Sequence, residues 1–213
     1  MTAAKRGTPI AAAFLAGVLM LSAGTGSALA QALTEDQILE ALKPRVTRSL
    51  TSTPADRTRA EEEERVIDNA VHQTQTRPLS PAQRDQMAAI SREKPKIDLE
   101  IYFDYKSAAI SAKAVPDLAI LGKALRNPDL AGSVFMIAGH TDAKGGDQYN
   151  LGLSERRAEA VRLYLIQKLG LSADTLMSVG YGKEQLKDKD DPYAAENRRV
   201  QVVNVGPKST AAK

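Results

Sequence analysis

Cysteine and tryptophan are both absent from the 213 residues, and histidine occurs only twice, at His72 and His140. Without cysteine the chain can form neither a disulfide nor a thiolate metal site, so its stability must come from burial and hydrogen bonds. An acylated bacterial anchor also requires a cysteine, and we therefore predict no lipid anchor. The formal charge is only +3, with Lys and Arg interspersed among acids, which argues against a nucleic-acid partner.

Long hydrophobic runs are also missing, apart from one near the amino terminus. Lys5 and Arg6 precede an apolar run over residues 10–21, and small residues lead from this run to Ala30. A spanning helix needs roughly 20 apolar residues to cross about 30 Å of hydrocarbon, and this run is shorter. The layout predicts a secretory signal peptide over residues 1–30, cleaved after Ala30. An uncleaved membrane anchor is the alternative.

Residues 31–95 are polar and are interrupted repeatedly by proline. Three short helices are expected there: one after a capping box of Thr34 and Gln37, one opening at the acidic run 61–64, and one with Ser80 as cap, Pro81 in its first turn and Gln83 after it. Their few large apolar residues do not offset an ordering entropy of roughly 1 to 2 kcal/mol per residue. We therefore predict a partly helical, solvated spacer, with binding to an envelope partner as the alternative.

Strands alternate with helices in the second half of the chain. The expected elements are strands at 97–103, 134–138, 176–181 and 199–205, helices at 111–126 and 154–168, and a left-handed cap at Gly170. The uniformly apolar run at 134–138 predicts a central strand. We predict an α/β (α+β) domain over residues 96–206, a two-layer sandwich with a four-stranded mixed sheet and helices on one face. A disordered tail is expected over residues 207–213.

A glycine-rich polar loop follows the second predicted strand, where the backbone can approach a ligand closely. This loop and the next helix contain Gly139-His140-Thr141-Asp142, Gly145, Tyr149-Asn150, Leu153-Ser154 and Arg157-Ala158. In order and spacing they resemble the signature GHTD..G...YN..LS..RA of the OmpA C-terminal, peptidoglycan-binding family. The resemblance extends to Ile101-Tyr102-Phe103-Asp104, Gly180-Tyr181-Gly182 and Asn197-Arg198-Arg199-Val200. The charged stretch 183–191 departs from the family pattern, which puts the shape of that loop in doubt.

The resemblance implies an OmpA-like fold and noncovalent binding of peptidoglycan through the diaminopimelate of its stem peptide. The matched ligand-binding residues are Asp142 and Arg157. A carboxylate accepts hydrogen bonds from an ammonium, while a guanidinium forks onto a carboxylate, so this pair suits an amino acid that carries both groups. Secondary ligand contacts are implied at Phe103, Asp104, Thr141, Asn150 and Arg198, each with a structural role as its alternative.

Arg157 also breaks a local rule if its helix begins at Ser154. The residue then lies in the first turn, where the helix dipole disfavours a cation, and broken local rules are concentrated at functional sites. One alternative is that Arg157 pairs with Asp142 or another acid of the fold. A second is that the helix begins earlier, at Asp147, in which case the dipole argument loses its force.

His140 invites a metal or catalytic interpretation, which we reject. A single His-x-Asp does not supply the three or four ligands that zinc needs, and no nucleophile with a base and an orienting partner is visible. We expect a binding protein without metal or cofactor, not an enzyme. Its expected place is the periplasm of a Gram-negative cell, at the cell wall and near the outer membrane. The alternative function is an adaptor whose amino-terminal helices bind an envelope partner, with the wall-binding domain as a tether.

Overall fold

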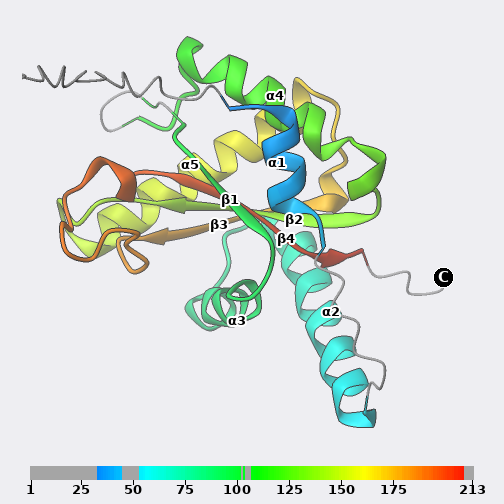
Figure 1. Cartoon of the computed structure of the whole chain (residues 1–213). Helices are drawn as coiled ribbons and strands as arrows, with labels where there is room; N and C mark the ends of the chain where they lie inside the picture. The colour runs from blue at the N-terminus through cyan, green and yellow to red at the C-terminus, as the bar shows by residue number, and fades with distance from the viewer. Residues whose placement is uncertain (1–32, 45–52, 102, 104–106, 209–213) are drawn as a thin grey trace, which may run out of the picture. The chain divides into compact units, whose positions relative to one another are not determined.

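The computed structural model describes residues 33–44, 53–101, 103 and 107–208. The predicted signal peptide and Asp104 lie outside these residues. The chain from Leu33 onward forms one compact unit built on a four-stranded sheet (Figure 1). None of the described helices is both long enough and apolar enough to cross a membrane.

The sheet contains β1 (Lys96–Leu99), β2 (Ser133–His140), β3 (Leu176–Gly182) and β4 (Val200–Pro207), in the spatial order β1-β4-β2-β3. β2 and β3 are parallel, and β4 is antiparallel to both β1 and β2. The predicted α+β fold with a mixed four-stranded sheet is therefore confirmed. Every residue of β2 is buried, as expected for an interior strand without polar alternation.

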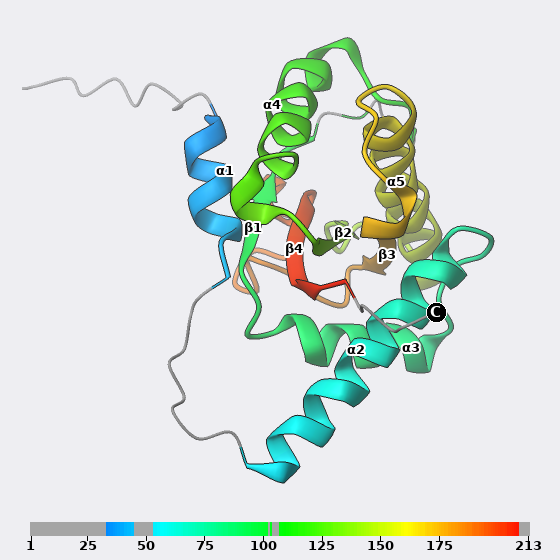
Figure 2. The same cartoon turned by 90° about the vertical axis from the view of Figure 1, so that its right-hand side faces the viewer.

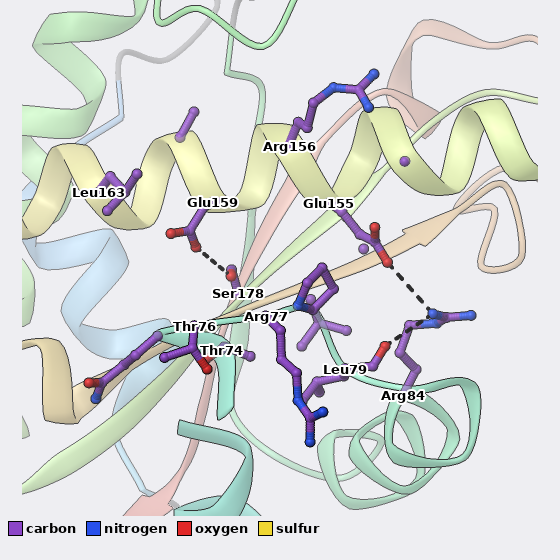
Figure 3. A pocket seen from close by; sticks show the side chains of 16 residues that line it. Thr74, Thr76, Arg77, Leu79, Arg84, Glu155, Arg156, Glu159, Leu163 and Ser178 are labelled. Atoms are coloured by element: carbon purple, nitrogen blue, oxygen red, sulfur yellow. Dashed lines mark hydrogen bonds and ion pairs between the residues drawn. The ribbon is translucent and has the colours of Figure 1, made fainter. Parts of the chain in front are cut away.

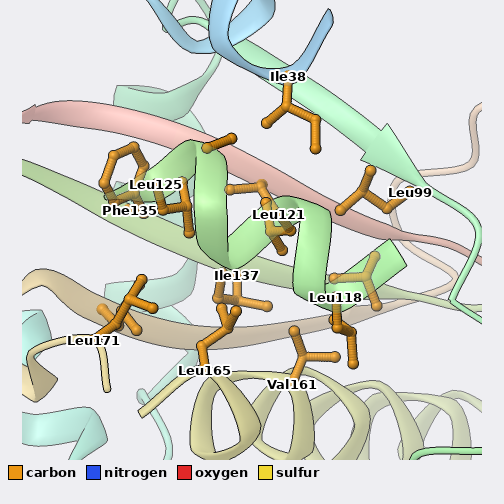
Figure 4. Packing of buried hydrophobic residues seen from close by; sticks show 14 of the residues in the cluster. Ile38, Leu99, Leu118, Leu121, Leu125, Phe135, Ile137, Val161, Leu165 and Leu171 are labelled. Carbon is orange, nitrogen blue, oxygen red and sulfur yellow. The ribbon is translucent and has the colours of Figure 1, made fainter. Parts of the chain in front are cut away.

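Three helices cover one face of the sheet: α1 (Glu35–Leu42), α4 (Val115–Leu125) and α5 (Asp147–Gln167). Their apolar side chains form one cluster with the strand residues on that face (Figure 4). The cluster includes Ile38, Leu99, Leu118, Leu121, Phe135, Ile137, Val161 and Leu165. Because side chains alternate along a strand, β2 directs residues 135 and 137 to this face and residues 134, 136 and 138 to the other.

The opposite face is covered by α2 (Pro54–Thr74) and α3 (Pro81–Ser91), so that the sheet lies between two layers of helix (Figure 2). The helical residues pack against the alternate side chains of the strands, in a cluster that includes Ile67, Val71, Leu79, Met87, Met136, Ala138, Met177, Val179 and Val203. Within residues 96–206 the helices α4 and α5 lie on one face, as predicted for the domain. The second face is covered by α2 and α3, which precede the domain in sequence. Strands that are apolar on both sides need cover on both sides, and α2 and α3 supply it.

The expectation of a solvated spacer over residues 31–95 is wrong for the described part of that region. Its three helices are present, but Ile38, Leu42 and Met87 are fully buried against the sheet domain. The side chain of Asn204 in β4 also donates to the carbonyl oxygen of Leu42 at 3.0 Å. The apolar residues of these helices are few, but the sheet supplies the rest of the surface that is buried. Treating the helices in isolation underestimated that burial.

Capping boxes fix the starts of all three amino-terminal helices. The boxes predicted at Thr34 and Ser80 are confirmed. α2 begins earlier than the acidic run 61–64, because Thr53 caps it and exchanges hydrogen bonds with Asp56. Capping boxes in the sequence therefore marked the helix starts correctly, and the box at Thr53 was overlooked.

Short 3-10 turns at Ala112–Ala114, Pro128–Leu130, Ala173–Thr175 and Ala195–Asn197 join the larger elements. The first of them splits the helix expected over 111–126, which becomes α-helical only at Val115. Beyond α5, Gly170 has φ +71° and its N–H donates to the carbonyl oxygen of Ile166 at 3.1 Å, which confirms the predicted left-handed cap.

Candidate functional site

The predicted ligand loop lies at the end of the sheet where β2 and β3 finish and β4 begins. The backbone N–H of Thr141 donates to the carbonyl oxygen of Gly182 at 2.8 Å, and that of Ala143 donates to Pro192 at 2.9 Å. These bonds fix the loop between the end of β3 and the segment that precedes β4. The loop is thus positioned by backbone contacts, which leaves its side chains available for other roles.

Asn150 holds the loop from within the fold. Its side chain is buried, and its amide donates to the carbonyl oxygen of Lys144 at 3.1 Å. Gly145 lies next to this bond with φ +100°, a conformation that favours glycine over residues with a side chain. This geometry favours the structural alternative for Asn150, a residue that shapes the loop.

α5 begins at Asp147, with Gly146 as its cap, so the alternative helix start is the one observed. Arg157 therefore lies in the helix interior, and the argument from a cation in the first turn was wrong. The close approach of α5 to β2 depends on Gly139, because a Cβ at that position would lie 2.2 Å from the backbone oxygen of Ser154. Glycine in the signature thus serves the packing that brings Arg157 over the end of the sheet.

Asp142 is held in place by two hydrogen bonds. Its Oδ1 accepts from the backbone N–H of Lys144 at 3.1 Å, and its Oδ2 accepts from Nη1 of Arg198 at 2.9 Å. The carboxylate is the more sheltered partner, since its side chain is 14% exposed and that of Arg198 is 47% exposed. The acid of the site is therefore fixed, while the arginine that holds it remains open to solvent.

Arg157 is anchored at one nitrogen. Its Nε donates to the carbonyl oxygen of Ser107 at 3.0 Å, and its guanidinium carbon lies 4.8 Å from the centroid of the half-buried Phe103 ring. Burial lowers the pKa of Arg157 below its ordinary value; Asp142 opposes the shift and Arg198 adds to it. Among the described residues no acid forms an ion pair with Arg157, and none bonds to its two terminal nitrogens.

Arg157 and Arg198 line a small cavity of about 160 Å³ at this end of the sheet. Its walls are Glu100, Ile101, Phe103, His140, Arg157, Ala195, Arg198 and Arg199. Asp142 does not line the cavity itself but is bonded to Arg198 at its edge. The structure therefore brings together four of the predicted residues, Phe103, Asp142, Arg157 and Arg198, while Asp104 lies outside the described residues.

The floor of this cavity contains buried polar atoms that lack hydrogen-bond partners among the described residues. They are both ring nitrogens of His140 and Nη1 of Arg199. Oγ1 of Thr141, the residue after His140, is also buried without a partner among the described residues, but Thr141 does not line the cavity. Burial is costly for unpaired polar groups, so such atoms usually mark a place where water or a ligand binds. The sequence reasoning missed Arg199 as a pocket residue. The only feature of the sequence that pointed to Arg199 was its position directly after Arg198.

His140 is a neutral residue of the floor. Its ring stacks on Tyr181 with centroids 5.6 Å apart, and burial, together with the nearby charge of Arg199, lowers its pKa to about 3. The described residues contain no cluster of His, Cys, Asp and Glu that could hold a metal ion. The site therefore presents the guanidinium groups of Arg157, Arg198 and Arg199, the carboxylates of Glu100 and Asp142, and an uncharged imidazole.

The loop that departs from the family pattern is organised by Asn197, which is fully buried. Its Oδ1 accepts from the backbone N–H groups of Lys187 and Asp188, at 2.7 and 2.9 Å, and its Nδ2 donates to Asp188 and Asp191. One side chain thus closes the loop through four hydrogen bonds. Because Asn197 directly precedes Arg198, it also fixes where that arginine leaves the backbone.

Fold and site together define an α+β binding module with a cationic cavity at the end of a mixed sheet. Residues 102–199 match the model of the OmpA family. The chain therefore carries an OmpA family domain over these residues, as the signature led us to expect.

Among curated proteins, the chain is 38% identical over 103 residues to the peptidoglycan-associated lipoprotein of Pseudomonas aeruginosa, a match that covers 47% of this chain and 59% of the relative. It is 31% identical over 108 residues to outer membrane porin F of the same organism, covering 51% of this chain and 30% of the relative. These matches span less than two thirds of either relative. The first is a lipoprotein by name, whereas this chain contains no cysteine.

Among solved structures, the chain is similar to the peptidoglycan-associated lipoprotein from Burkholderia pseudomallei, with 32% identity and a TM-score of 0.41 over 48% of this chain and 86% of that one. The OmpA-like domain of FopA1 from Francisella tularensis gives 25% identity and a TM-score of 0.42, over 50% of this chain and 69% of that one. The regions matched cover about half of this chain.

Proposed function

We propose that this domain binds peptidoglycan noncovalently through the diaminopimelate of the stem peptide, within a Gram-negative cell-envelope protein in the periplasm. Membership of residues 102–199 in the OmpA family, and similarity to proteins named peptidoglycan-associated, support this class of ligand. The observation that carries the proposal is the geometry of three charged residues. Arg157 and Arg198 face one cavity, and Asp142 is bonded to the outer of the two.

Arg157 would bind the side-chain carboxylate of diaminopimelate. Its Nε is occupied by the carbonyl oxygen of Ser107, which fixes the plane of the guanidinium. Within the described residues neither terminal nitrogen has a hydrogen-bond partner, and together they would form a forked pair of hydrogen bonds to a carboxylate, a geometry that lysine does not reproduce. The stacking of Phe103 on the same group reduces the freedom that Arg157 loses when a ligand binds.

Asp142 would accept from the ammonium at the same end of the diaminopimelate side chain. Its Oδ2 is already bonded to Arg198, so the ligand ammonium shares this carboxylate with a solvent-exposed arginine. The three side chains carry a net positive charge, which favours a ligand with at least one carboxylate. A stem peptide with lysine at the same position lacks the second carboxylate and leaves Arg157 without its partner, so it should bind more weakly.

Affinity for one stem should be modest. Each charge-assisted hydrogen bond contributes about 1.5 to 3 kcal/mol, and part of this offsets the freedom that the ligand loses. Many stems along one polymer still retain the protein, because a released domain rebinds at high local concentration. We propose a binding role and no catalysis: the charged groups at the cavity suit recognition of a zwitterion.

Co-sedimentation with purified sacculi tests this proposal. Residues 31–213 should sediment with sacculi that contain diaminopimelate, and Asp142→Ala or Arg157→Ala should reduce the bound fraction by about tenfold or more, since each removes a charge-assisted contact. Arg156→Ala is the matched control, because this exposed neighbour on α5 does not line the ligand cavity. Both variants should keep the cooperative unfolding of the unmodified protein.

The outcome that contradicts the proposal is unchanged sedimentation of both variants, or an equal loss with Arg156→Ala. Sacculi with lysine in place of diaminopimelate provide a second comparison. Equal retention on the two kinds of sacculi would leave general wall binding in place and refute the assignment of diaminopimelate.

The adaptor function remains a second proposal, in which the exposed surfaces of α2 and α3 would bind an envelope partner while their apolar sides pack on the sheet. This packing changes the experiment that tests it. Deleting residues 31–95 would expose the face of the sheet that Ile67 and Met87 cover, so the deletion would unfold the domain and would not isolate a tether. Point substitutions on the surface of these helices are therefore the appropriate tool.

A further inference from the structure

A second cavity of about 420 Å³ lies away from the ligand loop, between α5, β3 and the connection from α2 to α3 (Figure 3). None of its lining residues is shared with the cavity at Arg157. Its volume falls within the range of roughly 300 to 1,000 Å³ that is usual for binding pockets. One wall comes from residues 74–84, which lie outside the matched OmpA region, so the cavity is formed jointly by the domain and its amino-terminal extension.

The floor of this cavity is the open edge of the sheet. β3 is the outermost strand, and within the described residues no strand pairs with its outer side. At the ends of β3 the outward-facing backbone groups are bonded to α5. The carbonyl oxygen of Leu176 accepts from Nε of Arg162 at 3.0 Å, and the N–H of Gly182 donates to Oγ of Ser154 at 2.8 Å.

Between these ends α5 packs on the buried Gly180, but among the described residues it forms no hydrogen bond with the backbone of Ser178 or Gly180. Because backbone groups alternate in direction along a strand, Ser178 and Gly180 present their N–H and C=O groups to the same side as the carbonyl oxygen of Leu176 and the N–H of Gly182. Both residues line the cavity. The cavity therefore opens onto backbone donors and acceptors that are spaced for pairing with another extended chain.

The two walls leave a channel along this edge. Glu155, Glu159 and Leu163 of α5 form one wall, and the connection from α2 to α3, with Arg77 and Leu79, forms the other (Figure 3). Leu163 is 37% exposed, which provides an apolar contact for a side chain in the channel. A channel with a wall on each side has room for one inserted strand. It would prevent the β3 edges of two copies of this chain from pairing, because the walls of the two copies would collide.

The charges of the channel favour an acidic occupant. Its two acids are engaged: Glu155 lies 3.6 Å from Arg84, and Glu159 accepts from Oγ of Ser178 at 2.7 Å. Arg77 and Arg156 also line the cavity, and neither has an ion pair within the described part of the chain. Figure 3 shows Arg156 directed away from the floor, so its charge lies at the outer rim.

We propose that this cavity binds an acidic, extended peptide segment of a partner protein, which pairs with β3 as an additional strand. Backbone hydrogen bonds to Ser178 and Gly180 would align the peptide, as in other cases of strand addition to a sheet edge. Arg77 and Arg156 would bind acidic side chains on either flank. The proposal is independent of wall binding, because the two cavities share no residue.

Capped synthetic peptides provide the test, with residues 31–213 as the protein. The probe is a fluorescent pentapeptide of alternating glutamate and valine, and its binding is measured by fluorescence anisotropy. Two comparison peptides are a lysine and valine counterpart and a glutamate peptide with N-methyl groups on alternate backbone nitrogens. We expect saturable binding of the glutamate and valine peptide. The lysine peptide should bind at least roughly tenfold more weakly because its charge is reversed, and the N-methylated peptide should do so because it cannot pair with a strand.

Arg77→Glu and Arg156→Glu should each lower the affinity for the acidic peptide by roughly fivefold to tenfold, because each reverses one charge at the rim. Arg65→Glu, on the exposed surface of α2 and outside the cavity, is the matched control and should have no comparable effect. Backbone amide resonances of Ser178 and Gly180 should shift on titration. Sedimentation with sacculi should be unchanged in all three variants, which separates this proposal from the wall-binding site.

Three results would overturn the proposal. The first is no saturable binding of the acidic peptide up to about 1 mM, an affinity too weak for specific recognition. The second is equal binding of the N-methylated peptide, which would show that the β3 edge is not paired. The third is a dimer of this chain in sedimentation equilibrium that Arg77→Glu disrupts, since the cavity would then serve contacts between copies.

Discussion

The imidazole of His140, which has no hydrogen-bond partner in the described part of the chain, should make the stability of the domain dependent on pH. The ring is almost fully buried, and burial lowers its pKa to about 3, whereas an unfolded histidine has a value of about 6.5. Between these values the unfolded chain binds a proton that the folded chain excludes. The free energy of unfolding must therefore fall as the pH falls from about 7.5 toward 3. The contribution of His140 to stability is fully present above the pKa of the unfolded histidine.

The expected magnitude follows from the two pKa values. Lowering the pH from about 7.5 to 5 protonates the unfolded histidine almost completely and the folded one hardly at all, which costs about 2 kcal/mol of stability. Urea unfolding of residues 31–213 at several pH values and constant ionic strength measures this loss. His140→Phe keeps an aromatic ring beside Tyr181 and removes the titrating group. Between the same two pH values this variant should therefore lose about 2 kcal/mol less unfolding free energy than the unmodified protein.

The comparison between variants is needed because carboxylates also titrate. Hydrogen bonding and ion pairing lower the pKa of Asp98 despite its burial, whereas burial raises that of Glu155, and these shifts change stability in opposite directions. The contribution of Glu155 cancels in the difference between the unmodified protein and His140→Phe, and that of Asp98 cancels apart from its interaction with His140. His72→Gln is the matched control, since it removes the other histidine. The reasoning is refuted if His140→Phe loses as much stability as the unmodified protein over this range, or if His72→Gln abolishes the loss.

Two further substitutions test the packing. Leu42→Ala should lower the free energy of unfolding by about 2 to 5 kcal/mol, because the side chain is fully buried in the core, whereas Val115→Ala at an exposed position should change it by less than about 1 kcal/mol. A loss below about 1 kcal/mol for Leu42→Ala in urea titrations would mean that α1 is not part of the core. Gly139→Ala should destabilise the domain by about 3 kcal/mol or more, since its Cβ would meet the backbone of Ser154, while Gly146→Ala has open space and should cost no more than about 1 kcal/mol. Equal melting temperatures for these two glycine variants would contradict the close approach of α5 to β2.

Much of the fold could be predicted because its strong signals are local. The uniform apolarity of residues 134–138 placed β2 inside the sheet, and the caps at Thr34, Ser80 and Gly170 marked helix ends that the structure confirms. The packing of α2 and α3 on the second face was not predicted, because their burial depends on a surface elsewhere in the chain. The uniform apolarity of β2 contained that information, since a strand without polar alternation is covered on both sides.

The site was predictable in its residues and not in its geometry. The signature identified Asp142 and Arg157, but no local pattern predicted that the carbonyl oxygen of Ser107 would anchor the guanidinium. The signature also did not predict that Arg198 would be the ion-pair partner of Asp142. These contacts join segments that are far apart in sequence, so they follow from the completed fold and not from any local periodicity.

The position of α1 determines how mechanical load would enter this domain. Ile38 and Leu42 are buried between α4 and the sheet, and the amide of Asn204 binds the last turn of α1 to β4. A force applied ahead of Leu33 therefore reaches the sheet through this helix. If the cavity at Arg157 binds peptidoglycan as proposed, the contacts of α1, rather than those of the OmpA region itself, would set the tension at which the protein first yields.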